Sequence, residues 1–375
     1  MPEKIVVFAP NWLGDAVMAL PALRAIRQHW PAATLIVAAR PPVAPLFPMV
    51  PGVDEVVSLG AAGGWRSAGA WAADARALAG ASAEVAILLP NSFRSALIAR
   101  QAGIPERWGF ATDLRGWLLT TRVPRPRGRM HQSEYYGALV AGLAEGAWPL
   151  FAKSATLLDP PVVARQQAEA LVARAGVAPD APLVGMAPGA AYGRAKQWPP
   201  ERFARLAELL HQRHGATAVL VGVRADRAAG ELIEREMASG KGRAPSGLLN
   251  LIGHTDLPTL VALMSRCHAF VSNDSGAMHL AAAVGVAVTA IFGSTDEQGT
   301  APLAGASATV APHEILTCEV WCRPCMLREC PIDHRCMTGI DPVRVSEAVR
   351  RQLALRSGPD TGADTATPID PGIEP

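Results

Sequence analysis

The sequence predicts an α/β protein with two doubly wound parallel sheets. Short apolar runs that suit buried strands alternate with longer helical runs, first from Ile5–Ala9 onward and again from Leu183–Ala187 onward. Strands that alternate with helices in this way form parallel sheets. A chain of 375 residues, half of them hydrophobic, is long enough to bury two cores.

In the first half, the shorter apolar runs predict strands and the longer periodic runs predict helices. The predicted strands are Ile5–Ala9, Thr34–Ala39, Glu55–Leu59 and Glu84–Leu89, and the predicted helices are Ala16–Trp30, Ala70–Ala79, Ser92–Ala102 and His131–Leu143. Between Thr112 and Arg129, two prolines and a run of arginines interrupt the alternation.

The second half repeats the alternation after a proline-rich junction around Pro160 to Asp180. The predicted strands are Leu183–Ala187, Thr217–Val223, Leu248–Ile252 and Val286–Ser294, and the predicted helices are Val162–Ala175, Glu201–His214, Asp226–Met237, Leu257–Cys267 and Asp341–Leu355. We therefore expect an N-terminal domain of residues 1–160 and a C-terminal domain of residues 161–355. Residues 356–375 have almost no apolar content and predict a disordered tail.

Charge and apolar patterning exclude several partners. The formal net charge is +2, so no global positive field draws the protein to nucleic acid. The chain begins with a strand-like run instead of the basic and apolar segments of a signal peptide. No apolar run approaches the roughly 18 residues that span a bilayer. These features predict a cytoplasmic protein without a transmembrane segment.

The stretch Asn273–His279 lies between two predicted strands, one at Cys267–Phe270 before it and one at Val286–Ser294 after it. Between these strands it predicts a tight turn into a short helix. Asp274 and Ser275 stand where this helix begins. Gly276 lets the backbone approach a ligand, and His279 points back toward the turn. Free N–H groups and the dipole at a helix start favour a phosphate. The alternative is a simple helix cap with an ordinary histidine nearby.

Two further loops follow predicted strands of the same half, and ligands bind beyond the carboxyl ends of such strands. The first loop contains Gly189 and ends at Lys196, a combination that can cradle a diphosphate and neutralise its charge. The second contains Asp226, which could accept hydrogen bonds from a ribose. A solvated lysine and a capping aspartate are the alternatives, but three such loops at adjacent strand ends favour a binding site.

In the N-terminal half, Asp15 follows the first predicted strand where a helix starts. Its place beside Gly14, facing the second domain, makes it a candidate general base. The alternative is a helix cap, which is a common role for aspartate at such a place.

The arginine run from Arg115 to Arg129 has irregular spacing and is stiffened by prolines. This pattern, with Arg122, Arg125 and Arg127 near its centre, suits the binding of several phosphates or carboxylates better than the packing of a core. The alternative is a solvated loop.

Five of the six cysteines lie between Cys318 and Cys336, which does not resemble a distributed disulfide framework. Cys322, Cys325, Cys330 and Cys336 have a spacing that suits tetrahedral zinc in a structural role. The alternative is a set of reduced thiols that pack a loop.

Three common motifs are missing from the sequence. Neither half has G-x-G-x-x-G after its first strand, which argues against a dinucleotide oxidoreductase. The P-loop and the G-x-S-x-G nucleophile elbow are also absent.

Four motifs together resemble the bacterial lipopolysaccharide heptosyltransferases, which form glycosyltransferase family 9. They are Asn11-Trp12-Leu13-Gly14-Asp15-Ala16-Val17-Met18, Lys196-Gln197-Trp198-Pro199, Asn273-Asp274-Ser275-Gly276-Ala277-Met278-His279, and Cys322-Arg323-Pro324-Cys325 through Arg328-Glu329-Cys330-Pro331. The similarity extends from about residue 4 to residue 355. The first and last motifs resemble the second heptosyltransferase of the pathway more than the first.

The resemblance implies a GT-B fold, in which two Rossmann-like domains face each other across a cleft. It implies an inverting transfer of heptose from ADP-L-glycero-beta-D-manno-heptose to the first heptose of the lipopolysaccharide inner core. That acceptor is carried on Kdo and lipid A, so the enzyme would act at the cytoplasmic face of the inner membrane. The class needs no metal for this transfer.

The resemblance also assigns roles to residues. Asp15 matches the proposed catalytic base and Lys196 the phosphate-contacting lysine. The donor-binding motif is matched by Asp274, Ser275, Gly276 and His279. Asp226 only approximates an acidic residue near the adenosine ribose.

Three alternatives remain at this point: another heptosyltransferase of the same pathway, a sugar-nucleotide epimerase of related fold, and a non-catalytic zinc module. The arginine run, with Arg66 or Arg94, would bind an anionic acceptor, which an epimerase does not need.

Overall fold

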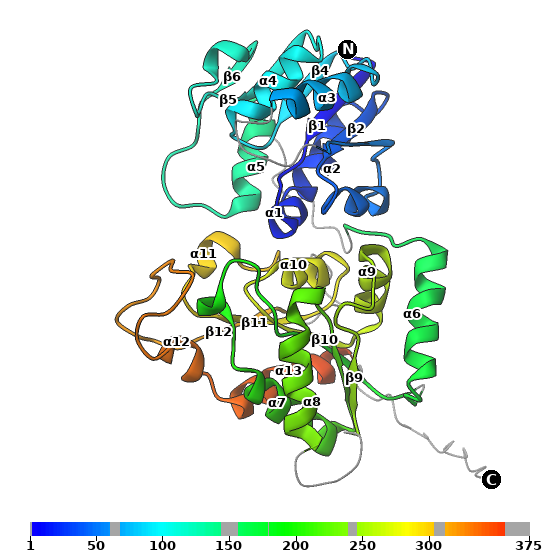
Figure 1. Ribbon diagram of the computed structural model, residues 1–375, viewed down its shortest axis with the longest axis vertical. Coiled ribbons are helices and arrows are strands. Elements are labelled where there is room, and N and C mark those ends of the chain that lie inside the picture. The colour runs from blue at the N-terminus through cyan, green and yellow to red at the C-terminus, as the bar shows by residue number, and fades with distance from the viewer. Residues whose placement is uncertain are drawn as a thin grey trace, which may run out of the picture.

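The computed structural model describes residues 2–60, 68–143, 157–178, 180–238, 246–303 and 312–356. It consists of two α/β halves, one above the other in Figure 1. Arg66 and residues 357–375 of the predicted disordered tail lie outside these ranges, whereas Arg356, the first residue of that predicted tail, ends a helix. In the described part of the chain, no helix is long and apolar enough to cross a membrane.

The first sheet has six parallel strands in the order β3-β2-β1-β4-β5-β6. The strands are β1 (Lys4–Phe8), β2 (Thr34–Ala39), β3 (Glu55–Ser58), β4 (Val85–Leu88), β5 (Glu106–Phe110) and β6 (Thr121–Val123). The helices of this half are α1 (Leu13–Met18), α2 (Leu20–His29), α3 (Ala68–Ala79), α4 (Phe93–Gln101) and α5 (Gln132–Ala141), with 3₁₀ turns η1 (Ala44–Met49) and η2 (Gly116–Leu118). Because successive side chains of a strand face opposite sides, Ile5 and Val7 join one apolar cluster and Val6 and Phe8 another.

The second sheet also has six parallel strands, in the order β12-β11-β10-β7-β8-β9. The strands are β7 (Leu183–Ala187), β8 (Thr217–Leu220), β9 (Leu248–Asn250), β10 (Ala269–Asn273), β11 (Val288–Phe292) and β12 (Glu314–Thr317). The helices are α6 (Val162–Arg174), α7 (Pro200–His214), α8 (Arg227–Ala238), α9 (Leu257–Arg266), α10 (Gly276–Ala283), α11 (Glu297–Thr300), α12 (Arg335–Thr338) and α13 (Pro342–Arg356), with 3₁₀ turns η3 (Arg194–Lys196) and η4 (Arg224–Asp226). Counted from its own first strand, this sheet repeats the strand order of the first.

Three strands are not predicted by the sequence pattern, namely β5, β6 and β12. β6 is three residues long, and β6 and β12 are edge strands of their sheets. β5 begins with the charged residues Glu106 and Arg107, and its first three residues are not fully buried. Such strands lack the continuous apolar run that marks a strand buried on both faces.

The predicted helix Ala16–Trp30 is two helices, because α1 ends at Met18 and α2 begins at Leu20. Pro21 has no N–H to donate and its ring would clash with the carbonyl of the preceding turn, which breaks a continuous helix. The helix also begins three residues earlier than predicted, at Leu13, so Asp15 lies in the first turn of α1.

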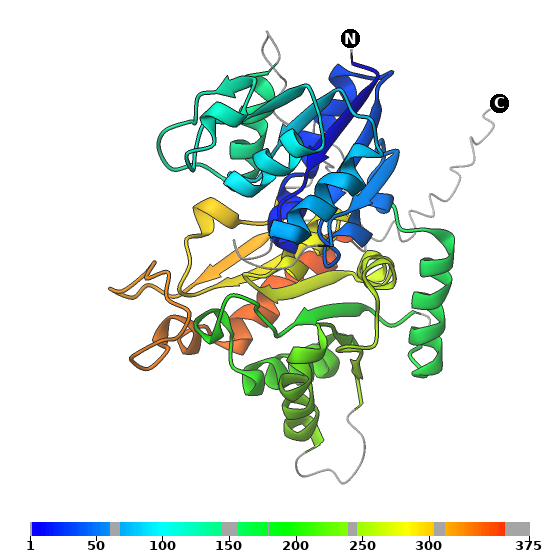
Figure 2. The same ribbon diagram turned by 45° about the horizontal axis from the view of Figure 1, so that its top comes forward.

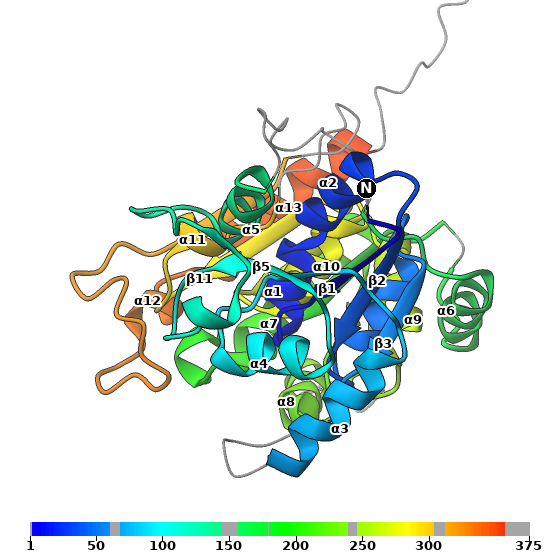
Figure 3. The same cartoon turned by 90° about the horizontal axis from the view of Figure 1, so that it is seen from above.

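The two halves pack against each other through α1 and α10, which lie together in Figures 1 and 3. One apolar cluster runs through both halves and contains Val17 of α1 and Met278 of α10. The two domains are therefore in direct contact at the start of these helices.

Candidate active site

The candidate site lies where the strand order of each sheet reverses. In the second sheet, β7 and β10 are neighbours although two strands lie between them in sequence. The loops after these strands carry Lys196 and Asp274, so both residues meet at the crevice where ligands bind in doubly wound sheets. Asp15 follows β1, which occupies the equivalent position in the first sheet.

Lys196 and Asp274 form an ion pair, with Nζ and Oδ2 separated by 2.6 Å. The lysine side chain is 14% exposed and the aspartate side chain 6%. Thr295, from the loop after β11, donates its hydroxyl to the same Oδ2 at 2.7 Å. The pair thus places one ammonium group, already held by a carboxylate, at the strand ends.

Asn273 connects the two loops through its side chain. Its Oδ1 accepts a hydrogen bond from the Trp198 backbone N–H at 3.0 Å, and its Nδ2 donates to the Pro188 carbonyl at 2.7 Å. The residue is fully buried, so both bonds are protected from water. Asn273 therefore fixes both ends of the loop that carries Lys196.

Ser275 occupies the N-cap position of α10, but its side chain makes no capping hydrogen bond. Its hydroxyl lies 3.0 Å from that of Ser272 instead. The N–H groups in the first turn of α10 are therefore not satisfied by the cap, and this helix start can bind an anion beside Lys196.

Asp15 faces this site from the other domain. Burial raises the pKa of its carboxyl above the ordinary value, while the charge of Lys196 lowers it and that of Asp274 raises it. In the described part of the chain, its carboxylate accepts no hydrogen bond and joins no ion pair. A partly buried, unpaired carboxylate with a raised pKa is suited to accept a proton.

Two glycines allow the domains to approach closely here. A side chain at Gly14 would lie 3.1 Å from the ring of His279, and one at Gly276 would lie 3.2 Å from Leu13. Gly276, predicted from the sequence to make room for a ligand, instead makes room for Leu13 of the other domain.

His279 is buried where the two helices meet, with 3% of its surface exposed. Burial lowers its pKa to about 4, so the imidazole is neutral at neutral pH. Its Nδ1 is buried and has no hydrogen-bond partner in the described residues. An unsatisfied buried nitrogen is costly, which marks a place where a ligand or water can bind.

Asp226 packs directly against Gly189, where a Cβ atom would lie 2.3 Å from its carboxylate. Its Oδ2 accepts a hydrogen bond from the Val223 backbone N–H at 3.0 Å. Burial raises the pKa of Asp226, and the Val223 hydrogen bond opposes this effect. Asp226 is therefore the third residue of η4 and bonds back to the N-cap residue Val223, while lying beside the glycine of the Lys196 loop.

The arginine run does not act as one group. The prediction that it avoids the core is wrong for Arg115, which is fully buried and donates hydrogen bonds to the carbonyls of Phe110, Pro90 and Ser92. These bonds satisfy the carbonyl groups where β4 and β5 end. Arg94, expected to meet an acceptor, is paired with the buried Asp74.

Arg122, Arg125 and Arg127 are exposed on β6 and the loop after it. The Arg125 guanidinium lies 5.7 Å from the centre of the Tyr135 ring. Arg129 reaches the other domain and pairs with Asp296 at 2.6 Å. The loop between β6 and α5 extends toward α11 in Figure 1, in agreement with this ion pair.

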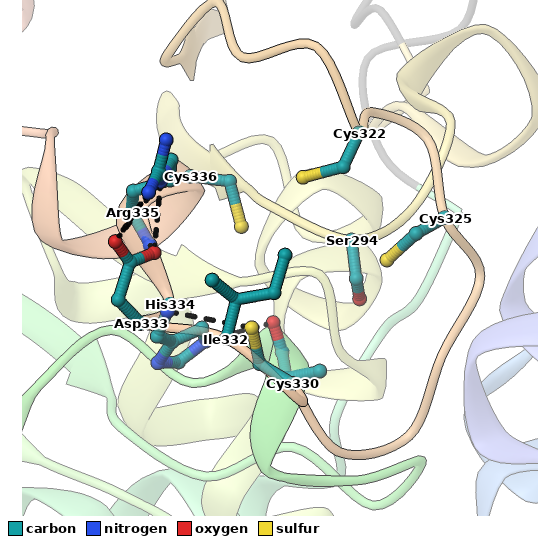
Figure 4. A pocket seen from close by; sticks show the side chains of 10 residues that line it. Ser294, Cys322, Cys325, Cys330, Ile332, Asp333, His334, Arg335 and Cys336 are labelled. Atoms are coloured by element: carbon teal, nitrogen blue, oxygen red, sulfur yellow. Dashed lines mark hydrogen bonds and ion pairs between the residues drawn. The ribbon is translucent and has the colours of Figure 1, made fainter.

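The four predicted zinc ligands line one pocket together with His334 (Figure 4). These ligands are Cys322, Cys325, Cys330 and Cys336, all free thiols. Burial, and then the neighbouring thiols, raise the pKa of Cys336. Within the described ranges, no group of three or more His, Cys, Asp or Glu side chains is placed to hold a metal ion. The zinc site therefore stays a prediction.

Four residues of the site were not predicted from the sequence, namely Asn273, Thr295, Tyr192 and Tyr136. Thr295 and Asn273 hold Asp274 and the Lys196 loop. The ammonium group of Lys196 lies 5.0 Å from the centre of the Tyr192 ring. Tyr136 of α5 is buried, and burial and then the charge of Asp15 raise its pKa, so it stays neutral. Asn273 and Tyr192 lay in stretches that the sequence marked, whereas Thr295 and Tyr136 did not.

Two doubly wound parallel sheets whose strand ends face each other form the GT-B fold. The family model of glycosyltransferase family 9 (heptosyltransferase) matches residues 71–335. The chain belongs to this family and is a glycosyltransferase.

Relatives and solved structures agree with this assignment. The chain is 33% identical over 304 residues to lipopolysaccharide heptosyltransferase 2 of Escherichia coli strain K12, which covers 80% of this chain and 85% of that protein. The Salmonella typhimurium LT2 protein of the same name has the same identity and coverage. The structure of E. coli ADP-heptose lps heptosyltransferase II matches with a TM-score of 0.76 and 28% identity, covering 94% of this chain and 99% of that one.

Proposed function

We propose that this protein transfers heptose from ADP-L-glycero-beta-D-manno-heptose to the first heptose of the lipopolysaccharide inner core, with inversion of the anomeric carbon. The names of its relatives support the donor and the lipopolysaccharide acceptor. The observation that carries the mechanism is the unpaired Asp15 carboxylate of one domain facing Lys196 and Asp274 of the other.

In the proposed reaction, the acceptor hydroxyl attacks the anomeric carbon while Asp15 accepts its proton. The new C–O bond forms as the bond to the β-phosphate of ADP breaks, and ADP leaves with the electron pair. Lys196 and the N–H groups at the start of α10 stabilise the negative charge that develops on the diphosphate. One displacement of this kind inverts the anomeric centre.

The neutral His279 acts in this proposal as a hydrogen-bonding group and not as a cation. Burial lowers the pKa of His279 to about 4, which favours a neutral ring at neutral pH. The buried, unpartnered Nδ1 is the atom available for a bond to bound donor or water. Asp226 and Gly189 flank the same loops and would border the nucleoside end of ADP.

The anionic acceptor would meet the N-terminal domain through Arg122, Arg125 and Arg127, which are exposed. The acceptor is anchored in a membrane, so the protein would visit the cytoplasmic face of the inner membrane as a peripheral enzyme. Such binding would be weakened by salt, because exposed charges are screened over about 10 Å at 0.1 M.

The transfer proposed here uses no metal ion, because Lys196 and the helix start supply positive charge beside the leaving group. Zinc bound by Cys322, Cys325, Cys330 and Cys336 would have a structural role. Metal analysis of the purified protein tests this point. About one equivalent of zinc per chain would support the zinc site, whereas a protein without zinc would indicate reduced thiols that bind no metal.

The test of the function is an ADP-release assay with two acceptors. Kdo-lipid A carrying one heptose should support ADP release and gain one heptose by mass spectrometry, whereas Kdo-lipid A without heptose should not. Transfer only to the heptose-free acceptor would identify the first enzyme of the pathway instead. Conversion of the nucleotide sugar without any acceptor would support the epimerase.

A further inference from the structure

The cysteine-rich segment, residues 318–336, packs against the two loops that hold the Lys196–Asp274 ion pair. In Figure 2 this segment projects, in orange, from one side of the C-terminal half. Its pocket is lined by Ala195 and Ser294 as well as by the thiols. Ala195 directly precedes Lys196, and Ser294 directly precedes Thr295, so the segment touches both loops next to the residues that contact Asp274.

The contacts with the Lys196 loop involve the loop backbone. Both polar backbone groups of Ala195 are bonded to the segment: its N–H donates to the Arg328 carbonyl at 2.9 Å, and its carbonyl lies 3.0 Å from His334 Nε2. A carbonyl can only accept, so Nε2 of His334 carries the hydrogen. Ala195 is 1% exposed, which shields both bonds from water.

Two further contacts hold the preceding turn. The Tyr192 hydroxyl donates to the Met326 carbonyl at 3.1 Å. A Cβ atom at Gly193 would lie 2.3 Å from the Arg328 carbonyl oxygen, so only glycine permits this approach. The Lys196 ammonium lies 5.0 Å from the centre of the Tyr192 ring, and the Arg328 guanidinium lies 5.1 Å from it.

The same segment holds the loop that carries Thr295. Arg323 donates to the carbonyls of Gly293 at 2.7 Å and Thr295 at 3.4 Å, and the Met326 N–H donates to the Ser294 carbonyl at 2.8 Å. The Lys196 and Thr295 side chains then converge on one oxygen of Asp274. The segment therefore holds both of the loops whose side chains meet at Asp274.

We propose that the cysteine-rich segment positions Lys196 for the donor diphosphate, with His334 as the positioning residue. Lys196 stands on a three-residue 3₁₀ turn, and a turn this short needs outside support to hold its ammonium group in place. The bonds to Ala195 supply that support one residue before Lys196. This inference rests on the proposed function, because it assumes that the diphosphate binds at Lys196.

The test is ADP affinity, measured by titration calorimetry, in variants of His334. His334→Ala should weaken ADP binding by about three- to tenfold, the change expected for loss of one hydrogen bond. His334→Gln keeps an N–H that can reach the carbonyl and should restore most of the affinity. His211→Ala is the matched control, because His211 also lies 3.2 Å from a backbone carbonyl of this domain, that of Ala216, away from the site.

A double-mutant cycle separates positioning from stability. If His334 acts through Lys196, His334→Ala should have little further effect on ADP binding in a Lys196→Ala background. The proposal would be overturned if His334→Ala weakened ADP binding equally in the native and Lys196→Ala backgrounds. It would also be overturned if His334→Ala weakened ADP binding no more than His211→Ala does. Tyr192→Phe removes only the hydroxyl bond to Met326 at an exposed position and should weaken ADP binding in the same direction, so the test survives if His334→Ala fails to fold.

The cycle also distinguishes this inference from the proposed function. Unchanged ADP binding in Lys196→Ala would show that the diphosphate binds elsewhere, and the function proposed for Lys196 would fail. Weakened binding in Lys196→Ala with unchanged binding in His334→Ala and Tyr192→Phe would refute only the positioning role of the segment.

Discussion

Replacing Asp15 by asparagine tests the catalytic base directly. Asparagine keeps the size of the side chain in the first turn of α1 but cannot accept a proton. A general base contributes roughly 10²- to 10⁴-fold to the rate, which equals about 3 to 5 kcal/mol of transition-state stabilisation. We therefore expect Asp15→Asn to lower kcat by about that factor while ADP affinity stays close to that of the native protein.

The same substitution should stabilise the fold, because burial raises the pKa of Asp15. A carboxyl whose pKa is higher in the folded than in the unfolded state binds protons more tightly when folded. Stability is then lost as pH rises from the ordinary value of 3.8 through the raised pKa, and the cost persists above it. At pH 7, Asp15→Asn removes this cost, so its melting temperature should equal or exceed that of the native protein.

The assay measures kcat for ADP release between pH 5 and pH 8, together with melting temperature. Native activity should rise with pH through a pKa above the usual carboxyl range, and the residual activity of Asp15→Asn should lack this rise. Asp113→Asn is the control, since Asp113 is exposed in the same domain at a left-handed position that asparagine tolerates. A kcat within a few-fold of native in Asp15→Asn would refute the base assignment, and a large loss in Asp113→Asn would show that the effect is not specific.

Three further outcomes are expected. Lys196→Ala should weaken ADP binding by about tenfold or more and lower the melting temperature, because it leaves the Asp274 carboxylate, which is 6% exposed, without its cation. Calorimetry that finds neither change would contradict the proposed site. Exchanging Arg122, Arg125 and Arg127 together for glutamine should raise the acceptor KM and reduce its salt sensitivity without changing ADP affinity, whereas native acceptor kinetics at low salt would identify a solvated loop. For His279, the pKa falls from 6.5 to about 4 on burial, so the folded state binds protons less tightly and stability is lost as pH falls through that window. In denaturant titrations, the free energy of unfolding should therefore decrease between pH 7 and pH 5 by roughly 2 kcal/mol less in His279→Asn than in the native protein. An unchanged pH dependence would contradict the buried neutral ring.

Much of the fold followed from the sequence, because local patterns determine it. The continuous apolar runs of β1, β2, β7 and β10 can only be buried strands, and the helices between them make the sheets parallel. The same patterns placed Asp15, Lys196 and Asp274 directly after strands, where ligands bind. The sequence pattern does not predict the edge strands β6 and β12, because a strand that is short or partly exposed lacks a continuous apolar run.

By itself, the sequence determined which residues follow which strands, since that depends on neighbours along the chain. The tertiary structure alone decided which strand ends lie side by side. Lys196 and Asp274 are 78 residues apart and pair only because β7 and β10 are neighbours in the sheet. Burial also depends on distant contacts: it made Arg115 a core residue and left His279 neutral, and it raised the pKa of Asp15. The cost of desolvating a charge is set by everything packed around it, and no local sequence pattern records that environment.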